Sequence, residues 1–204
     1  MRSGAVKLFA LVLLLQGCAA LFGWDIHAPG ILSADGAARI RPVPERVALY
    51  FGPELVRYES RARGSRTADP TTFHAGEAFA PILIEAFQSG FEEFVMMETD
   101  PTADILEQYG IKYLAVVRIR DFQNRMTWKG QALTLRTETA VLDSHLQPLA
   151  RFESRGTSDA EKVFAKKGGP EVNLNAALEN NAIGILQYLQ DAIRSGQWKS
   201  GGSA

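Results

Sequence analysis

The chain has little of two residue types on which many sites and folds depend. Its 204 residues include a single cysteine, Cys18, and three histidines. A single cysteine excludes a disulfide framework within the chain. The chain also lacks an excess of either charge, because 22 Lys+Arg and 23 Asp+Glu leave a formal net charge of −1. Beyond its first residues, the chain contains no apolar run of the roughly 20 residues that a membrane-spanning helix needs.

The first residues have the three-part organisation of a secretion signal. Arg2 and Lys7 give a positive start without any acid, and residues 8–15 form an unbroken apolar run before small residues. That run is much too short to span a bilayer as a mature helix, which needs roughly 20 apolar residues. We therefore predict that residues 1–17 are a cleaved signal peptide.

The single cysteine ends a four-residue motif, Leu15-Gln16-Gly17-Cys18, that resembles the lipobox of bacterial lipoproteins. An aliphatic residue stands three positions before the cysteine and a small residue directly before it, whereas Gln16 is an uncommon occupant of its position. The resemblance implies cleavage before Cys18 and its acylation with three chains, which anchor a protein stably to a membrane. The alternative is an ordinary signal peptide with an incidental cysteine.

The residue after the cysteine bears on which membrane holds the anchor. In lipoproteins of the enteric type, an aspartate at this position retains the product in the inner membrane, and this chain has Ala19 there. The resemblance therefore implies the outer membrane, on its periplasmic face, with the inner membrane as the alternative. The membrane, through acylated Cys18, is one predicted partner.

The composition that remains after cleavage indicates one ordinary globular domain. Removing residues 1–17 leaves 187 residues (204 − 17) with 20 Lys+Arg (22 − 2) and 23 Asp+Glu, a net charge of −3. A nucleic-acid-binding domain would be basic, so no nucleic-acid partner is expected. Glycines and prolines punctuate residues 18–45, which we predict to be the lipidated cysteine and a tether. Residues 46–196 then form a single periplasmic domain, and residues 197–204 a disordered tail.

Hydrophobic periodicity predicts the class of this domain. Apolar residues recur every three or four positions over residues 76–94 and again from residue 173 to 195, which predicts two main helices. A shorter helix is expected over residues 104–109. The predicted strands cover residues 46–51, 94–98, 112–120, 131–142 and 149–155. This order predicts an α+β two-layer sandwich, in which two main helices cover one face of a mostly antiparallel sheet of about four to five strands.

The same order of elements after a lipidated start resembles small envelope lipoproteins of the YajG-type, CsgG-like and PelC-like groups. The segments that carry the resemblance are the helix around residues 78–94, the helix and strand of residues 105–117, and the hairpin of residues 141–149. CsgG-like proteins also have pore-forming segments, for which this chain shows no clear candidate hairpin. The resemblance transfers no functional residue.

Few residues suggest catalysis or metal binding. None of His27, His74 and His145 has a second histidine or an acid at metal-ligand spacing on the same predicted element, so surface polar roles are expected. Cys18 is committed to lipid, and the sequence shows no nucleophile elbow, phosphate-binding loop or zinc-protease helix. We therefore expect no enzymatic activity, no cofactor and no metal.

One predicted loop is rich in arginine. Arg57, Arg61, Arg63 and Arg66 fall within ten residues and are opposed by Glu59. Guanidinium groups match phosphate and carboxylate oxygens, so this loop could contact lipid headgroups or an acidic partner. The alternative is a solvated loop without a ligand.

Three hypotheses for function remain. The first is a non-enzymatic accessory or assembly factor of a secretion, polysaccharide-export or cell-wall complex, with self-association into a ring as a variant; an exposed apolar patch would favour it. The second is a carrier of lipid or lipopolysaccharide fragments, favoured by a dry pocket. The third is an unrecognised hydrolase, favoured by a cleft with convergent titratable residues.

Overall fold

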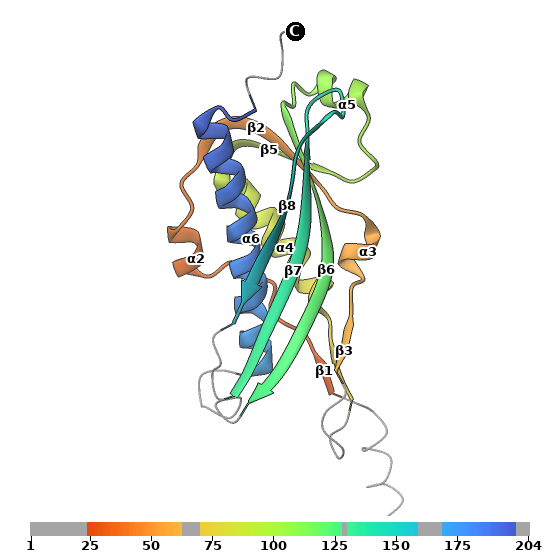
Figure 1. Ribbon diagram of the computed structural model, residues 1–204, viewed down its shortest axis with the longest axis vertical. Coiled ribbons are helices and arrows are strands. Elements are labelled where there is room, and N and C mark those ends of the chain that lie inside the picture. The colour runs from red at the N-terminus through yellow and green to blue at the C-terminus, as the bar shows by residue number, and fades with distance from the viewer. Residues whose placement is uncertain (1–23, 63–69, 128–129, 159–168, 199–204) are drawn as a thin grey trace, which may run out of the picture.

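A five-stranded sheet forms the centre of the protein (Figure 1). The structure, a computed structural model, describes residues 24–62, 70–127, 130–158 and 169–198. The strands follow the spatial order β5-β2-β6-β7-β8. They are β2 (Val43–Tyr50), β5 (Phe91–Met97), β6 (Tyr113–Thr127), β7 (Gly130–Leu142) and β8 (Pro148–Thr157). All five predicted strands are therefore present, and β6 continues well beyond its expected end.

The sheet combines parallel and antiparallel pairs. The long β6–β7 and β7–β8 ladders are antiparallel, as the alternating pattern of residues 131–142 predicted. Strand β2 is parallel to both of its neighbours, β5 and β6. Helices lie between β2 and β5 and between β5 and β6 in the chain, and such crossovers are what parallel pairing requires. The α+β class is thus confirmed, and the parallel pairing of β2 with both neighbours is a feature that the strand patterns did not reveal.

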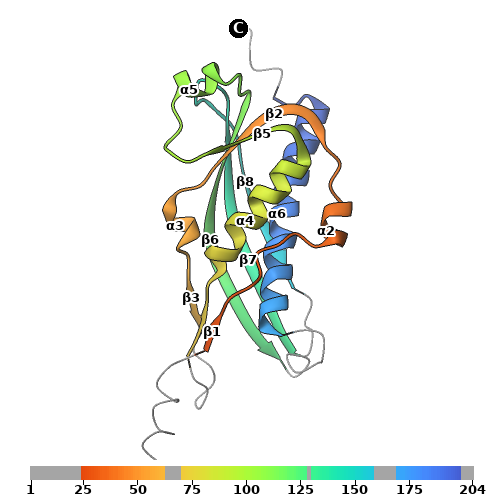
Figure 2. The same cartoon turned by 180° about the vertical axis from the view of Figure 1, so that it is seen from behind.

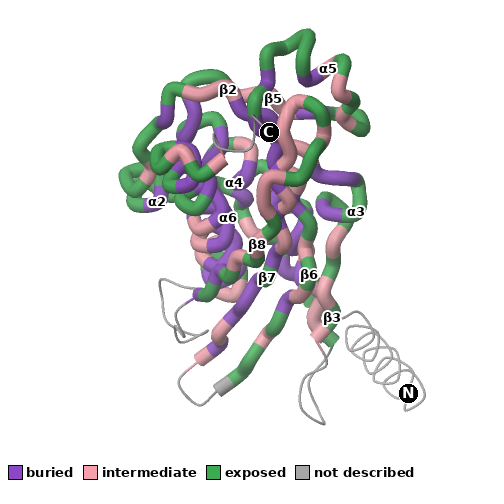
Figure 3. Tube along the Cα trace, turned by 45° about the horizontal axis from the view of Figure 1, so that its top comes forward, coloured by how far each residue is buried: buried purple, intermediate pink, exposed green. Residues whose placement is uncertain are grey.

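Two long helices, α4 (Ala75–Gly90) and α6 (Pro170–Ser195), cover one face of the sheet, as Figure 2 shows from behind. Phe79, Leu83 and Phe87 of α4 are fully buried, and Leu178 and Leu186 of α6 join them in one core. Figure 3 shows that buried residues line both helices and the adjacent strands. Within the described residues, no helix is at once long and apolar enough to cross a membrane.

The first long helix is shorter than its sequence pattern predicted. It ends at Gly90, and Phe91 is already extended, with φ −132° and ψ 144°. A Cβ on Gly90 would lie 2.5 Å from the Leu186 side chain, so α6 crosses close to this point. The rings of Phe91 and Phe94 still contact Phe87, at centroid distances of 5.7 and 6.2 Å. The regular spacing of phenylalanines therefore runs from the helix into the strand, because both elements face one core. This is why the predicted helix extended too far.

The segment expected to be a tether belongs to the domain from residue 24 onward. Strand β1 (Trp24–Ile26) and helix α2 (Ala34–Ala38) lie within it, and Ile26 is only 3% exposed. Side chains of the two long helices bind its backbone: Glu85 accepts from Leu32 N at 2.8 Å, and Glu179 accepts from Ser33 N at 2.7 Å. The prediction that residues 24–45 form a tether is wrong, because side-chain acceptors on α4 and α6 satisfy this irregular backbone. Residues 18–23 lie outside the described residues.

A second, three-stranded sheet has the order β1-β4-β3 and includes Arg61 of the predicted arginine-rich loop. Strands β3 (Ser60–Ala62) and β4 (Thr71–Phe73) follow a short helix, α3 (Pro53–Val56), while β1 pairs parallel with β4. Phe73 packs against Phe122 of β6, at a centroid distance of 5.2 Å. This contact joins the small sheet to the main core.

The two ends of the five-stranded sheet differ. A short helix, α5 (Ala103–Gln108), covers the face opposite α4 and α6 at one end, where Leu106 packs with Ala48 and Leu114 in a second apolar cluster.

The predicted disordered tail begins at residue 197. Its Trp198 packs on Tyr113, with ring centroids 5.5 Å apart, and residues 199–204 lie outside the described residues.

Candidate functional site

The predicted lipid anchor enters the domain at one end. Cys18 itself lies outside the described residues, and Trp24, the first described residue, follows it by six positions. Six residues span at most about 20 Å even when fully extended. Strand β1 starts at the end of the domain where β6 ends and β7 begins (Figures 1 and 2). An acylated Cys18 would therefore hold this end of the domain close to the membrane.

The same end exposes apolar and basic side chains. Trp24, at the start of β1, is 68% exposed, and Met126, near the end of β6, is 61% exposed. Arg125 beside Met126 is also exposed. Exposed aromatic and apolar groups next to a cation are typical of surfaces that contact the lipid–water boundary.

The structure separates the predicted arginine loop into two parts. Arg57 is the C-terminal cap of α3, and Arg61 lies in β3, where both are exposed. Arg63 and Arg66 lie outside the described residues. A role for these arginines in binding lipid headgroups or an acidic partner stays a prediction.

A larger charged surface, which the sequence analysis missed, lies on the five-stranded sheet. We call it the open sheet face: the face opposite α4 and α6, beyond the part that α5 covers. Strand register places Arg118, Glu138 and Glu153 in one row, and Asp121, Arg136 and Arg155 in the next. Its charged members are Arg118, Arg120, Asp121, Arg125, Arg136, Glu138, Arg151, Glu153 and Arg155. Six arginines against three acids give this face a net charge of +3 (6 − 3), whereas the predicted mature chain has a net charge of −3.

Glu138 is the electrostatic centre of the open sheet face. Arg120 donates a hydrogen bond to one of its oxygens, and Arg151 Nε lies 3.7 Å from the other. The hydrogen bond from Arg120 lowers the pKa of Glu138, with further lowering from the charges of Arg151 and Arg118, against a smaller opposing effect of burial. Glu138 thus stays ionised and neutralises part of the positive charge of this face. Arg136 and Arg155, in the neighbouring row, remain exposed.

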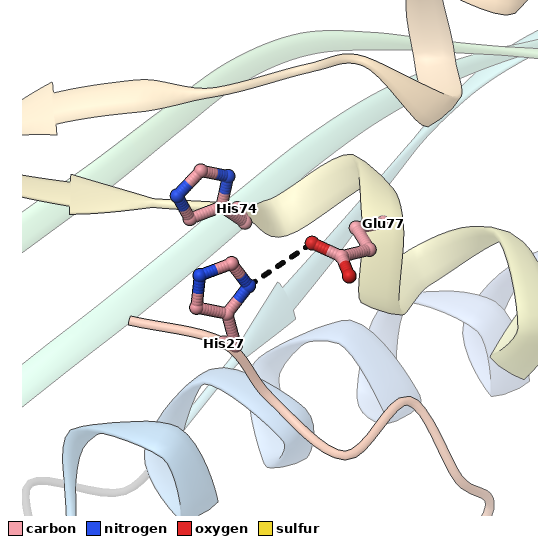
Figure 4. A group of neighbouring side chains, drawn as sticks. All are labelled: His27, His74 and Glu77. Atoms are coloured by element: carbon pink, nitrogen blue, oxygen red, sulfur yellow. Dashed lines mark hydrogen bonds and ion pairs between the residues drawn. The ribbon is translucent and has the colours of Figure 1, made fainter. Parts of the chain in front are cut away.

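A cluster of histidines and acids, shown in Figure 4, is the one place where described residues offer several metal-type ligands together. His27 follows β1, His74 follows β4, and Glu77 lies in the first turn of α4. The two imidazole rings are stacked, with centroids 4.0 Å apart and planes 8° apart. His27 Nδ1 and Glu77 Oε2 are 3.0 Å apart. One ligand atom from each of the three residues lies within 4.8 Å of the other two.

Two further acids border this cluster. Glu59 Oε1 lies 3.2 Å from His74 Nδ1, and Asp25 Oδ1 lies 3.7 Å from His74 Nε2. His74 is the less exposed histidine, with 20% of its side chain accessible against 54% for His27. Its Nε2 is buried without a hydrogen-bond partner among the described residues. A buried nitrogen left without a hydrogen bond is uncommon in proteins and calls for an explanation.

Spacing along the chain could not reveal this cluster, because His27 and His74 are 47 residues apart (74 − 27). The parallel register pairs Ile26 with Phe73, and each histidine is the next residue in its chain. His145, the third histidine, lies apart from them and forms a single pair with Glu107 at 3.0 Å. Only the pairing of β1 with β4 shows that His27 and His74 are neighbours.

Comparison with known proteins shows distant likenesses. No protein-family model and no curated protein matches the chain. Among solved structures, it is similar to the hypothetical protein CT253 of Chlamydia trachomatis, with a TM-score of 0.45 and 7% identity over 74% of this chain and 99% of that one. It is also similar to a PelC dodecamer subunit of Paraburkholderia phytofirmans, with a TM-score of 0.42 and 13% identity over 80% and 93%. The lipoprotein GNA1162 of Neisseria meningitidis gives a TM-score of 0.25 and 10% identity over 48% and 56%. TM-scores below 0.5 assign no function to this chain.

Proposed function

We propose that this protein is a lipid-anchored, non-enzymatic component of the bacterial envelope, whose domain is held directly at a membrane surface. The observation that carries the proposal is the short distance between the lipobox cysteine and the folded domain. Only residues 19–23 separate Cys18 from Trp24, and the backbone from residue 24 onward is bonded into the domain. A lipid-anchored domain attached this closely cannot reach far from its membrane. From Ala19 we further propose the periplasmic face of the outer membrane.

Acylation of Cys18 is the first test of this proposal. Mass spectrometry of the full chain purified from membranes is expected to find an N-terminal peptide that starts at acylated Cys18. The variant Cys18→Ser is expected to lose all acyl mass and to remain at precursor size, because the lipid is attached to the thiol. The matched control Ala20→Ser, which leaves the motif intact, should be processed as the wild-type chain is. An unacylated N-terminus at Ala19 or beyond would show an ordinary signal peptide and overturn the proposal.

For the accessory role, we propose that the open sheet face binds an acidic partner in a secretion, polysaccharide-export or cell-wall complex. Its exposed Arg136 and Arg155 are paired across the β7–β8 ladder, whereas Glu138 compensates Arg120 and Arg151. Guanidinium groups bind carboxylates and phosphates in pairs, so charge complementarity would select such a partner. The carrier and hydrolase hypotheses stay predictions.

Site-specific crosslinking in intact cells tests this docking surface. A photo-crosslinking residue in place of Arg155 is expected to give one discrete adduct with an envelope protein. The same residue in place of Asp191, which is exposed on α6 at the other face of the sheet, is the matched control and should give none. Adducts from position 191 alone would assign docking to the helical face. Adducts with the protein itself at position 155 would replace an acidic partner with self-association.

A further inference from the structure

We propose that His27, His74 and Glu77 bind a divalent transition-metal ion, and that zinc fits this donor set best. The three residues come from separate segments, yet one ligand atom from each lies within 4.8 Å of the other two (Figure 4). Two imidazoles with one carboxylate are a recurrent protein ligand set for zinc, with water or a further ligand completing the tetrahedron. Calcium and magnesium prefer oxygen ligands alone, so two nitrogens select against them.

The geometry requires a small rearrangement on binding. Zinc lies about 2.0–2.2 Å from nitrogen and oxygen ligands, so the three atoms must draw closer together. The parallel stacking of the rings also prevents the nitrogen lone pairs from converging on one point. His27 is the residue free to adjust, because 54% of its side chain is exposed. A metal would therefore replace the His27–Glu77 hydrogen bond and rotate the His27 ring out of the stack.

The surroundings of His74 favour metal binding. His74 Nδ1 lies 3.2 Å from Glu59 Oε1, and a proton on this nitrogen, facing the carboxylate, leaves the lone pair of Nε2 free. That Nε2 is buried and without a hydrogen-bond partner in the described structure. A carboxylate on the second ring nitrogen is the usual support of a metal-binding histidine. Asp25, Glu59 and Glu77 also supply negative charge that compensates a divalent cation.

The position of the site gives the metal a structural consequence. His27 belongs to the segment that follows the predicted anchor, whereas His74 and Glu77 belong to the start of α4. A bound metal would cross-link these two parts and strengthen the attachment of the anchor segment to the domain. The site does not depend on acylation of Cys18, so its test is independent of the test of the lipid anchor.

Metal binding can be measured on the full chain, purified in detergent without a polyhistidine tag and treated with a chelator. Calorimetric titration with Zn²⁺ is expected to show one equivalent bound, and Co²⁺ should give the visible absorption of a tetrahedral site with nitrogen and oxygen ligands. His27→Gln is expected to weaken Zn²⁺ binding at least about tenfold, since even supporting residues of metal sites have effects of about that size. His74→Gln should do the same.

The variant His145→Gln is the matched control, because His145 also pairs with one glutamate but lies outside the cluster. Its Zn²⁺ affinity is expected to equal that of the wild-type chain. Because His27 is exposed, His27→Gln should keep the wild-type circular dichroism spectrum, which separates lost binding from lost folding. Failure of the wild-type chain to bind Zn²⁺ or Co²⁺ at micromolar concentration, or equal affinities for wild type and His27→Gln, would overturn the proposal.

Discussion

Replacing Gly76 by alanine is expected to destabilise the domain by about 3 kcal/mol, which lowers the thermal midpoint by about 10 °C. A Cβ at this position would lie 1.9 Å from Leu55 O, 2.7 Å from Tyr58 N and 2.8 Å from Val56 O. All three are backbone atoms at the end of α3, so no side-chain rotation can relieve the overlap. The hydrogen bond from Gly76 N to Tyr58 O, 2.9 Å long, holds the two segments together at this point.

Chemical denaturation of Gly76→Ala beside Gly184→Ala provides a matched comparison. Both glycines lie in long helices, but a Cβ on Gly184 would meet no heavy atom within 4 Å. Gly184→Ala is therefore expected to stabilise the domain by about 0.5–1 kcal/mol, through the higher helix propensity of alanine. If Gly76→Ala were as stable as the wild type, α3 and α4 would not approach each other as closely as the structure has them. Because His74 and Glu77 flank Gly76, Gly76→Ala should also weaken metal binding.

Periodicity was a reliable guide wherever an element has one buried face. The alternation over residues 131–142 predicted β7 because Leu133, Leu135, Thr137 and Thr139 all face α6 and the core. It failed where two elements share one core without a break in spacing, as at Gly90, where apolar residues continue from α4 into β5. It also failed before residue 46, because the fold there depends on side chains distant in sequence. Glu85 and Glu179 accept hydrogen bonds from the backbone of Leu32 and Ser33, and no local sequence pattern indicates such distant acceptors.

The candidate sites were predictable to different degrees. The open sheet face follows from the predicted hairpin: once residues 131–142 and 149–155 are paired, Arg136 and Arg155 must share its polar face. The arginines near residue 60 are apparent in the sequence because they are close along the chain, whereas those of the open sheet face come together only in space. The histidine cluster needed the pairing of β1 with β4, two three-residue strands with too little pattern to be recognised. Contacts between such short strands are determined by the finished fold and not by local sequence.

Replacing Asn181 by alanine is expected to cost about 3 kcal/mol, because it leaves buried polar groups without partners. Asn181 is fully buried in the middle of α6. Its amide nitrogen donates to Leu135 O at 3.2 Å and Ser154 O at 3.1 Å, and its oxygen accepts from Thr137 Oγ1 at 2.8 Å. One side chain thereby joins the helix to both β7 and β8. Nearby, a Cβ on Gly156 would lie 2.4 Å from Asn181 N, so helix and strand are too close for water to replace the lost amide.

The neighbouring Asn180 supplies the control for this prediction. Asn180 also bonds to the β8 strand, donating to Thr157 O at 2.9 Å, but that bond is exposed to solvent. Water can replace it, so Asn180→Ala should cost less than about 1 kcal/mol. A double-mutant cycle with Thr137→Val then isolates the buried pair: the combined loss should be smaller than the sum of the single losses, because removing both partners leaves neither of them unsatisfied. Additive losses would mean that Thr137 and Asn181 stabilise the domain separately, and that the bond between them contributes little to holding α6 on the sheet.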